Sequence, residues 1–251
     1  MDRCNLHDPA ARPKSFWFAT FNSRPASALV LCHFESNTVS VVPAVFGSAE
    51  KISGIVGGQA SFWKTSITAA FKAMSGDFNN DGKMDLVVTD PGDVIFSDLV
   101  SVLLGSGDGT FQSHVDYHTD TSPETLNIGD LNRDGNPDLV VGTRSGIVIL
   151  LGNGDGTFQR FVEYPKPQVY AVALADFNGD AILDLAVGTV NSEAVAVMHG
   201  NGDGTFQDAI HVPVSAENVA LAAGTFTGDQ APDLAAGFGG TFTLLVNRGF
   251  H

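Results

Sequence analysis

The chain has 251 residues, enough for one large domain or two small ones, and 43% of them are apolar, which excludes wholesale disorder. A formal net charge of −15 argues against nucleic acid and anionic membranes as partners. No segment reaches the roughly 18 uninterrupted apolar residues that a membrane-spanning helix needs.

The first 14 residues form an N-terminal segment ahead of the patterned part of the chain. They lack a basic start followed by an apolar stretch, so we predict no signal peptide. The protein would then stay inside the cell, or the chain begins downstream of its export signal. Cys4 and Cys32 are the only cysteines, and the sequence favours two separate thiols over a disulfide between them.

Two interleaved motifs recur along the rest of the chain. "DFNNDGKMDLVV" at residue 77 returns at 130 and 176, in degenerate form at 225, and without its carboxylates at 20. The second motif, "GDGTFQ", follows at Asp108, Asp155 and Asp203. These recurrences predict five repeats within a domain spanning 15–251, at roughly 15–60, 61–112, 113–159, 160–207 and 208–251.

Each repeat is predicted to form short strands. In the fourth, four apolar or alternating segments bounded by Gly, Asn and Asp occupy 169–176, 183–189, 193–200 and 205–212. Four short strands in every repeat of this length are typical of one blade of a β-propeller. We therefore predict an all-β propeller of four-stranded antiparallel blades. The five repeats would close a five-bladed ring or form part of a larger propeller, for example one with seven blades.

The first motif places oxygen donors at alternate positions, numbered here as places one to nine of the loop. Calcium binds six to eight oxygen ligands, and a glycine turn returns the last carboxylate to the ion. Places one, three, five and nine offer side chains, and place seven offers its backbone carbonyl. The predicted calcium ligands are Asp77, Asn79, Asp81, Lys83 and Asp85; Asp130, Asn132, Asp134, Asn136 and Asp138; and Asp176, Asn178, Asp180, Ile182 and Asp184.

The alternative is that these loops are ordinary Asp/Asn/Gly turns. Calcium is favoured because Asp recurs at place nine, where a strand begins and Asp is disfavoured. The third loop is expected to be weaker because Ala181 replaces the glycine. The fourth loop keeps only Asp229 and Asp233 and is expected to be empty. Soft metals are excluded because no Cys or His stands in these loops. The expected role of calcium is structural.

The paired motifs "GDFNNDGKMDLVV", "GDLNRDGNPDLVVG" and "LLGNGDGTFQ" resemble the FG-GAP/VCBS-type repeats of surface and secreted proteins. They are also similar to the calcium-binding blades of the integrin alpha-chain propeller. The resemblance implies calcium in the loop joining the first two strands of a blade, and an extracellular or cell-surface location. It implies no particular activity, because relatives serve adhesion, carbohydrate binding and as accessories to enzymes.

No catalytic constellation is visible in the sequence. The glycines of "GNGDGTF" are predicted to form hairpin turns rather than a phosphate-binding loop, with Phe111, Phe158 and Phe206 packed between blades. We therefore expect a non-enzymatic module that binds a glycan or protein ligand. The alternatives are a hydrolase or lyase with an active site on the propeller axis, and a scaffold fragment of a larger surface protein. Self-association is expected if the propeller is incomplete.

Overall fold

The computed structural model describes residues 13–20, 27–33, 38–43, 61–64, 72–90, 98–108, 110–189, 192–214, 220–238 and 241–248, with side chains only from residue 72 onward. The predictions for the loop at residue 20, for Cys4 and for most of the N-terminal segment fall outside these residues.

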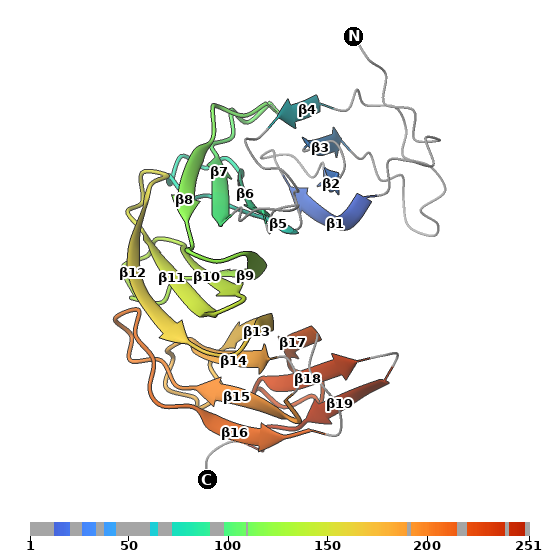
Figure 1. Cartoon of the computed structure of the whole chain (residues 1–251), viewed down its shortest axis with the longest axis vertical. Coiled ribbons are helices and arrows are strands. Elements are labelled where there is room, and N and C mark those ends of the chain that lie inside the picture. The colour runs from blue at the N-terminus through green and yellow to red at the C-terminus, as the bar shows by residue number, and fades with distance from the viewer. Residues whose placement is uncertain are drawn as a thin grey trace. The chain divides into compact units, whose positions relative to one another are not determined.

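The described residues form strands and no helix. Every strand pairing is antiparallel, and the strands fall into five sheets (Figure 1). The first sheet contains β1 (Pro13–Thr20), β2 (Ser27–His33), β3 (Thr38–Pro43) and β4 (Ser61–Lys64). The second contains β5 (Lys72–Gly76), β6 (Asp85–Asp90), β7 (Leu99–Leu103) and β8 (Val115–His118).

The remaining strands form three further sheets. The third contains β9 (Pro123–Gly129), β10 (Asp138–Thr143), β11 (Gly146–Gly152) and β12 (Phe158–Pro165). The fourth contains β13 (Val169–Ala175), β14 (Asp184–Thr189), β15 (Ala194–Met198) and β16 (Ile210–Pro213). The fifth has three strands, β17 (Ala220–Gly224), β18 (Asp233–Phe238) and β19 (Thr241–Leu245). Within the described residues, no helix has the length and hydropathy to cross a membrane.

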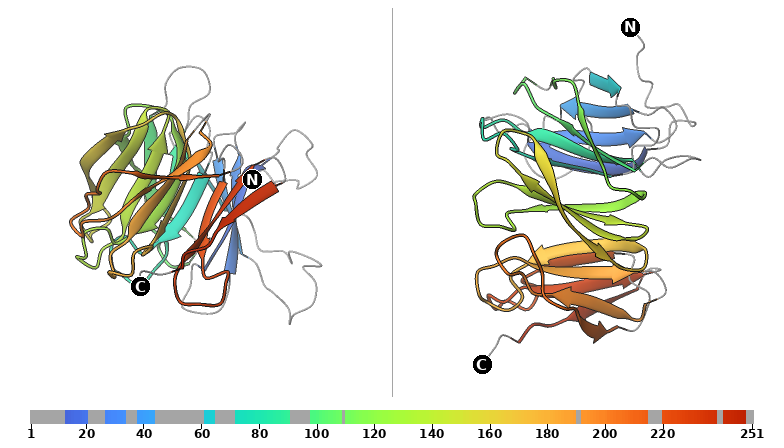
Figure 2. Two further views of the ribbon diagram at one scale, coloured as in Figure 1. Left: turned by 90° about the horizontal axis from the view of Figure 1, so that it is seen from below. Right: turned by 60° about the vertical axis from the view of Figure 1, so that its left-hand side comes forward.

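The chain divides into two compact units. One comprises Met1–Ser122 with Asp155–Thr157, and the other comprises Pro123–Gly154 with Phe158–His251. In the first unit β1 contacts β5, and in the second β9 contacts β13, which contacts β17. These are the first strands of successive sheets, and propeller blades meet in this way along their innermost strands. Figure 2 shows the sheets of the second unit, coloured yellow-green to red, layered one on the next. The predicted all-β propeller fold is confirmed.

The second, third and fourth sheets begin and end later along the chain than the repeats predicted there. β8 falls within the predicted third repeat, yet it pairs with β7 in the second sheet. The reason is that the GDGTF turn joins the third and fourth strands of a sheet, so the fourth strand follows the motif. The four strands predicted in the fourth repeat are present as β13 to β16, the last of them later than predicted, at Ile210–Pro213.

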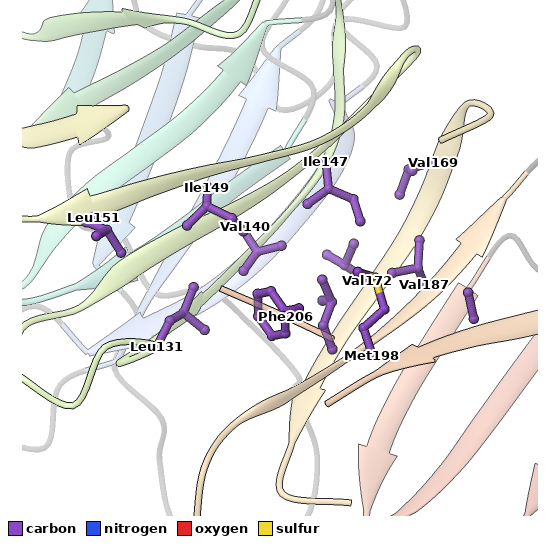
Figure 3. Close-up of a cluster of buried hydrophobic side chains, with 12 residues drawn as sticks. Leu131, Val140, Ile147, Ile149, Leu151, Val169, Val172, Val187, Met198 and Phe206 are labelled. Atoms are coloured by element: carbon purple, nitrogen blue, oxygen red, sulfur yellow. The ribbon is translucent and has the colours of Figure 1, made fainter. Parts of the chain in front are cut away.

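The central strands of the third sheet, β10 and β11, carry apolar residues on both faces. Every residue of β10 and β11 is buried, whereas the outer strand β8 is largely exposed. Between the third and fourth sheets, a cluster of buried side chains includes Leu131, Val140 and Met198, with Phe206 lying among them (Figure 3). The prediction that Phe206 packs between blades is confirmed.

Candidate calcium-binding loops

The four candidate loops occupy equivalent places in four sheets. They join β5 to β6, β9 to β10, β13 to β14 and β17 to β18. Each loop therefore connects the first two strands of its sheet, as the family resemblance implied. The three loops predicted to bind calcium come first, and the degenerate loop lies in the fifth sheet.

The oxygens at places one and three converge on one backbone N–H. Oδ1 of Asp77 and Oδ1 of Asn79 both accept a hydrogen bond from the N–H of Asp81, each at 3.1 Å. The other carboxylate oxygen of Asp77 accepts from the N–H of Gly82 at 2.8 Å. The second and third loops repeat all three bonds with Asp130 and Asn132 and with Asp176 and Asn178. The sequence pattern thus reproduces the same local geometry three times.

The backbone of the three loops turns at places four and six, where φ is positive. The six residues are Asn80 and Gly82, Arg133 and Gly135, and Gly179 and Ala181, with φ between 55° and 85°. Ala181 adopts φ 64° where the other two loops have glycine. An alanine there is strained, because its Cβ approaches the neighbouring carbonyl oxygen. In the degenerate loop, Gly228 at place four has a positive φ and Gln230 at place six does not.

The exposed carboxylate at place five pairs with a lysine in the first loop and bonds to an asparagine amide in the second and third. In the first loop Nζ of Lys83 donates to Oδ2 of Asp81 at 2.9 Å, which lowers the pKa of Asp81 and raises that of Lys83. In the second and third loops the amide of the place-three asparagine donates to this carboxylate. Although partial desolvation raises the pKa of Asp134, hydrogen bonds from Asn136 and Asn132 bring it below its usual value.

The carboxylate at place nine is fully buried in all four loops and joins two parts of its sheet. Oδ2 of Asp85 accepts from the N–H of Phe78 at 2.8 Å, and Oδ1 accepts from the N–H of Gly105 at 2.7 Å. Gly105 opens the GDGTF turn between the third and fourth strands. The equivalent carboxylates bond in the same way, Asp138 to Leu131 and Gly152, Asp184 to Phe177 and Gly200, and Asp233 to Phe226 and Asn247.

This buried carboxylate supplies a reason for Asp at place nine that is independent of any metal. The degenerate loop has lost the acidic residue at place one, yet Asp233 keeps both bonds. The argument that Asp at a strand start indicates calcium is therefore weakened, because a buried backbone N–H must find an acceptor. Desolvation raises the pKa of Asp85 and Asp138 above the usual value, although their N–H partners oppose it.

The donor chemistry of the three loops fits a hard cation such as calcium. Each loop gathers carboxylate, amide and carbonyl oxygens, and a carboxylate oxygen that accepts one N–H keeps a further lone pair. The carboxylates instead bond to the loop's own N–H groups, and among the described residues no three His, Cys, Asp or Glu side chains form a metal-holding group.

The GDGTF turns are closed by their own side chains. Asp108, Asp155 and Asp203 each accept a hydrogen bond from the N–H of the threonine two residues later, at 2.9 Å. The threonine hydroxyl bonds to the same oxygen and lowers the pKa of each carboxyl. A carboxylate in this position would repel a phosphate. In the second unit, the N–H of Gly204 also donates to the carbonyl of Leu131 at 3.1 Å, a contact that the sequence did not reveal.

The structure also joins polar residues that the sequence left separate. The hydroxyl of Ser101 bonds to Asp116, whose other oxygen lies 3.6 Å from Nε2 of His114. Here the carboxylate lies between serine and imidazole, whereas a hydrolytic triad needs the imidazole in the middle. His118 pairs with Asp98 rather than with His114. In the fourth sheet, Nδ1 of His199 lies 3.3 Å from Oδ2 of Asp184, so one candidate calcium ligand has an imidazole neighbour.

Comparison with protein families identifies the repeat from which this fold is built. An FG-GAP-like repeat model matches residues 77–141, 130–187 and 176–236, which together span more than half of the chain. The chain belongs to the FG-GAP-like repeat family. Each match begins at place one of a candidate calcium loop and ends within the second strand of the following sheet. No curated protein matches the FG-GAP chain in sequence.

Two solved structures share the fold at low sequence identity. One is a lectin from Agrocybe aegerita, described as specifically recognising non-reducing terminal N-acetylglucosamine. It has a TM-score of 0.56 and 19% identity, over 93% of this chain and 66% of the other. The second is BBS1N in complex with ARL6DN, with a TM-score of 0.53 and 16% identity, over 89% and 62%. The FG-GAP chain thus spans slightly less than two thirds of the length of these structures.

Proposed function

We propose that the FG-GAP chain is a non-enzymatic module that binds a glycan and is stabilised by calcium in three loops. The observation that carries the metal part is the same five-place donor set, with the same internal hydrogen bonds, in three consecutive sheets. The glycan part is supported by the fold shared with a lectin, which is an argument from analogy.

Calcium would be held by side chains at places one, three, five and nine and by the carbonyl at place seven. In the first loop these are Asp77, Asn79, Asp81, Asp85 and the carbonyl of Lys83. Because each loop is anchored between two paired strands, binding would stiffen the blade rather than open it. A structural site of this kind suits the millimolar calcium outside cells, so we place the protein on the cell surface or outside the cell.

Calorimetric titration of the purified chain tests the glycan part. The probes are an oligosaccharide ending in N-acetylglucosamine and a matched one ending in galactose, each in millimolar calcium and in chelator. Saturable binding of either sugar, weaker in chelator, supports the proposal. If neither probe gives a heat of binding and no sugar on a broad glycan array is bound, the glycan proposal is rejected.

A second candidate function is recognition of a protein. The observation that favours it is the fold shared with BBS1N, whose structure was solved in complex with ARL6DN. If no glycan on the array is bound but calcium still raises the melting temperature, protein recognition and the metal proposal both remain supported.

A further inference from the structure

Three polar side chains of the second unit meet at the end of the sheets opposite the candidate calcium loops. Oε1 of Glu124 accepts hydrogen bonds from Nε of Arg144 at 2.9 Å and from Nε2 of Gln168 at 3.1 Å. Glu124 lies near the start of β9, Arg144 in the turn between β10 and β11, and Gln168 directly before β13. We call these three residues the rim cluster. Asp130, which opens the second candidate loop, follows Glu124 at the far end of the extended strand, roughly 20 Å away.

The backbone is irregular at the place from which Glu124 projects. The register of β9 against β10 shifts there, and Glu124 has no cross-strand partner on β10. β13 shifts in the same way against β14, and Tyr170 is the residue left without a partner. In the second and fifth sheets the first two strands pair without such a shift. Bulges re-aim side chains and are common beside functional sites, so this end of the third and fourth sheets differs from that of the second and fifth.

Backbone contacts hold together the segments that carry the rim cluster. The N–H of Lys166 donates to the carbonyl of Ser145 at 3.0 Å, which joins the loop before β13 to the turn between β10 and β11. β9 and β10 both contact β13. Gly142 makes this packing close, because a Cβ there would lie 2.6 Å from Cγ1 of Val169. The rim cluster is therefore preformed, and a ligand would lose little affinity to ordering it.

The rim cluster keeps hydrogen-bonding capacity for a ligand. The side chain of Glu124 is only 11% exposed, and its second oxygen, Oε2, accepts no hydrogen bond from the described residues. Among those residues the one fully buried side-chain polar atom without a partner is Nδ1 of His199, so Oε2 is open to solvent. Arg144 is 61% exposed, and its terminal nitrogens donate to no described residue. An ion pair with so exposed a partner adds little to stability, so the fold itself gains little from it.

We propose that the rim cluster is the glycan subsite of this module and binds two adjacent hydroxyl groups of a neutral terminal sugar. One hydroxyl donates to Oε2 of Glu124, and the oxygen of its neighbour accepts from the terminal nitrogens of Arg144. A carboxylate beside a guanidinium matches such a pair, because one group accepts and the other donates. Tyr170, partly exposed at the equivalent place in β13, is the aromatic residue available to cover the apolar face of the sugar. This inference rests on the proposed glycan binding and adds its site and ligand class.

Calorimetric titration of the whole chain tests the inference. The probes are oligosaccharides ending in N-acetylglucosamine or galactose, and the same sugars with a methyl ether on O3, which leaves no two adjacent free hydroxyls on the terminal ring. A different glycan that is bound on the array takes their place. The methyl ethers are expected to bind at least tenfold more weakly, because a site that hydrogen-bonds a hydroxyl rejects an analogue lacking it.

Glu124→Gln and Arg144→Gln are each expected to weaken binding of the unmodified probe at least tenfold. The matched controls are Glu163→Gln and Arg160→Gln. Arg160 and Glu163 form an ion pair at 3.1 Å on the outer strand β12, three strands from β9. Both controls should bind like the wild type. Arg144 is largely exposed, so Arg144→Gln keeps the test decisive if circular dichroism shows that Glu124→Gln does not fold.

The possible failures separate this inference from the proposed function. If the wild type binds a glycan and neither rim substitution weakens it, the rim cluster is not the site, while glycan binding itself stands. Equal binding of the methyl ethers overturns the assignment to adjacent hydroxyls. If the wild type binds no glycan at all, the glycan proposal and this inference are both rejected.

Discussion

Oδ1 of Asp138 accepts a hydrogen bond from the backbone N–H of Gly152 at 2.8 Å, while Oδ2 accepts from Leu131. One buried carboxylate thus joins the loop between the first two strands of a sheet to the turn between its last two. Gly152 must be glycine for this approach, because a Cβ there would collide with the carbonyl oxygen of Pro137. The same arrangement occurs at Gly105 and Gly200.

Replacing this carboxylate should destabilise the fold whether or not calcium is present. Asp138→Asn turns an amide group toward a backbone donor and should lower the free energy of unfolding by about 1–3 kcal/mol. Urea denaturation measures the loss. The discriminating variant is Asp233→Asn in the degenerate loop, which should lower the melting temperature equally in calcium and in chelator. A loss at Asp233 seen only with calcium would contradict the independence of this bond from metal.

Removing the carboxylate at place one should abolish calcium stabilisation of its loop. With an affinity in the millimolar range typical of extracellular sites, millimolar calcium adds about 1 kcal/mol per site. Asp77→Ala, Asp130→Ala and Asp176→Ala should each remove one such increment from the calcium-dependent shift in melting temperature. Thr225→Ala, at place one of the degenerate loop, is the matched control and should leave the shift unchanged. Magnesium should not substitute. No shift at several millimolar calcium would reject the metal proposal.

The positive φ at place six makes two opposite substitutions informative. Ala181→Gly relieves the strained backbone of the third loop and should raise the free energy of unfolding by about 1 kcal/mol. Gly135→Ala introduces the same strain in the second loop and should lower it by a similar amount. A Cβ at Gly135 meets no atom within 4 Å, so that variant reports the backbone alone. The free energy of unfolding of both variants is measured by chemical denaturation. If both substitutions raise it, or both lower it, the loop geometry is contradicted.

Lowering the pH should stabilise the metal-free chain and reduce the stability that calcium adds. Burial raises the folded-state pKa of Asp85 and Asp138 above the ordinary 3.8, so between these values the folded chain binds more protons than the unfolded one. Their contribution to the stability of the metal-free chain therefore grows as pH falls through the raised pKa, and is complete below 3.8.

Calcium binds ionised carboxylates, so the stability that calcium adds should decrease as the pH falls through the raised pKa values of these carboxyl groups. Melting temperatures measured from pH 7 to about 4, in calcium and in metal-free buffer, should converge as the pH falls. A calcium increment that persists undiminished at the lowest pH would contradict ligation by these carboxylates.

The sequence by itself determined the repeat, the propeller fold and the position of the candidate loops. Period-two apolar runs and recurring Asp-Gly turns are local signals, and they appear in the strands and turns of the second, third and fourth sheets. Phe206 could be assigned to the space between blades for a similar reason. It is an apolar residue directly after a polar Gly-Asp-Gly-Thr turn, so burial against the neighbouring sheet is favoured.

Only the tertiary structure decided what the carboxylate at place nine does and where each sheet ends. Asp85 and Gly105 are 20 residues apart, and their bond exists because the second hairpin folds back against the first loop. β8 joins the second sheet because backbone pairing with β7, rather than the start of a motif, defines a blade. The packing of the fifth sheet is likewise a tertiary fact. Leu221, Leu234 and Leu245 pack against the fourth sheet, whereas Phe242 on the same sheet is 74% exposed, because successive side chains of a strand point to opposite faces.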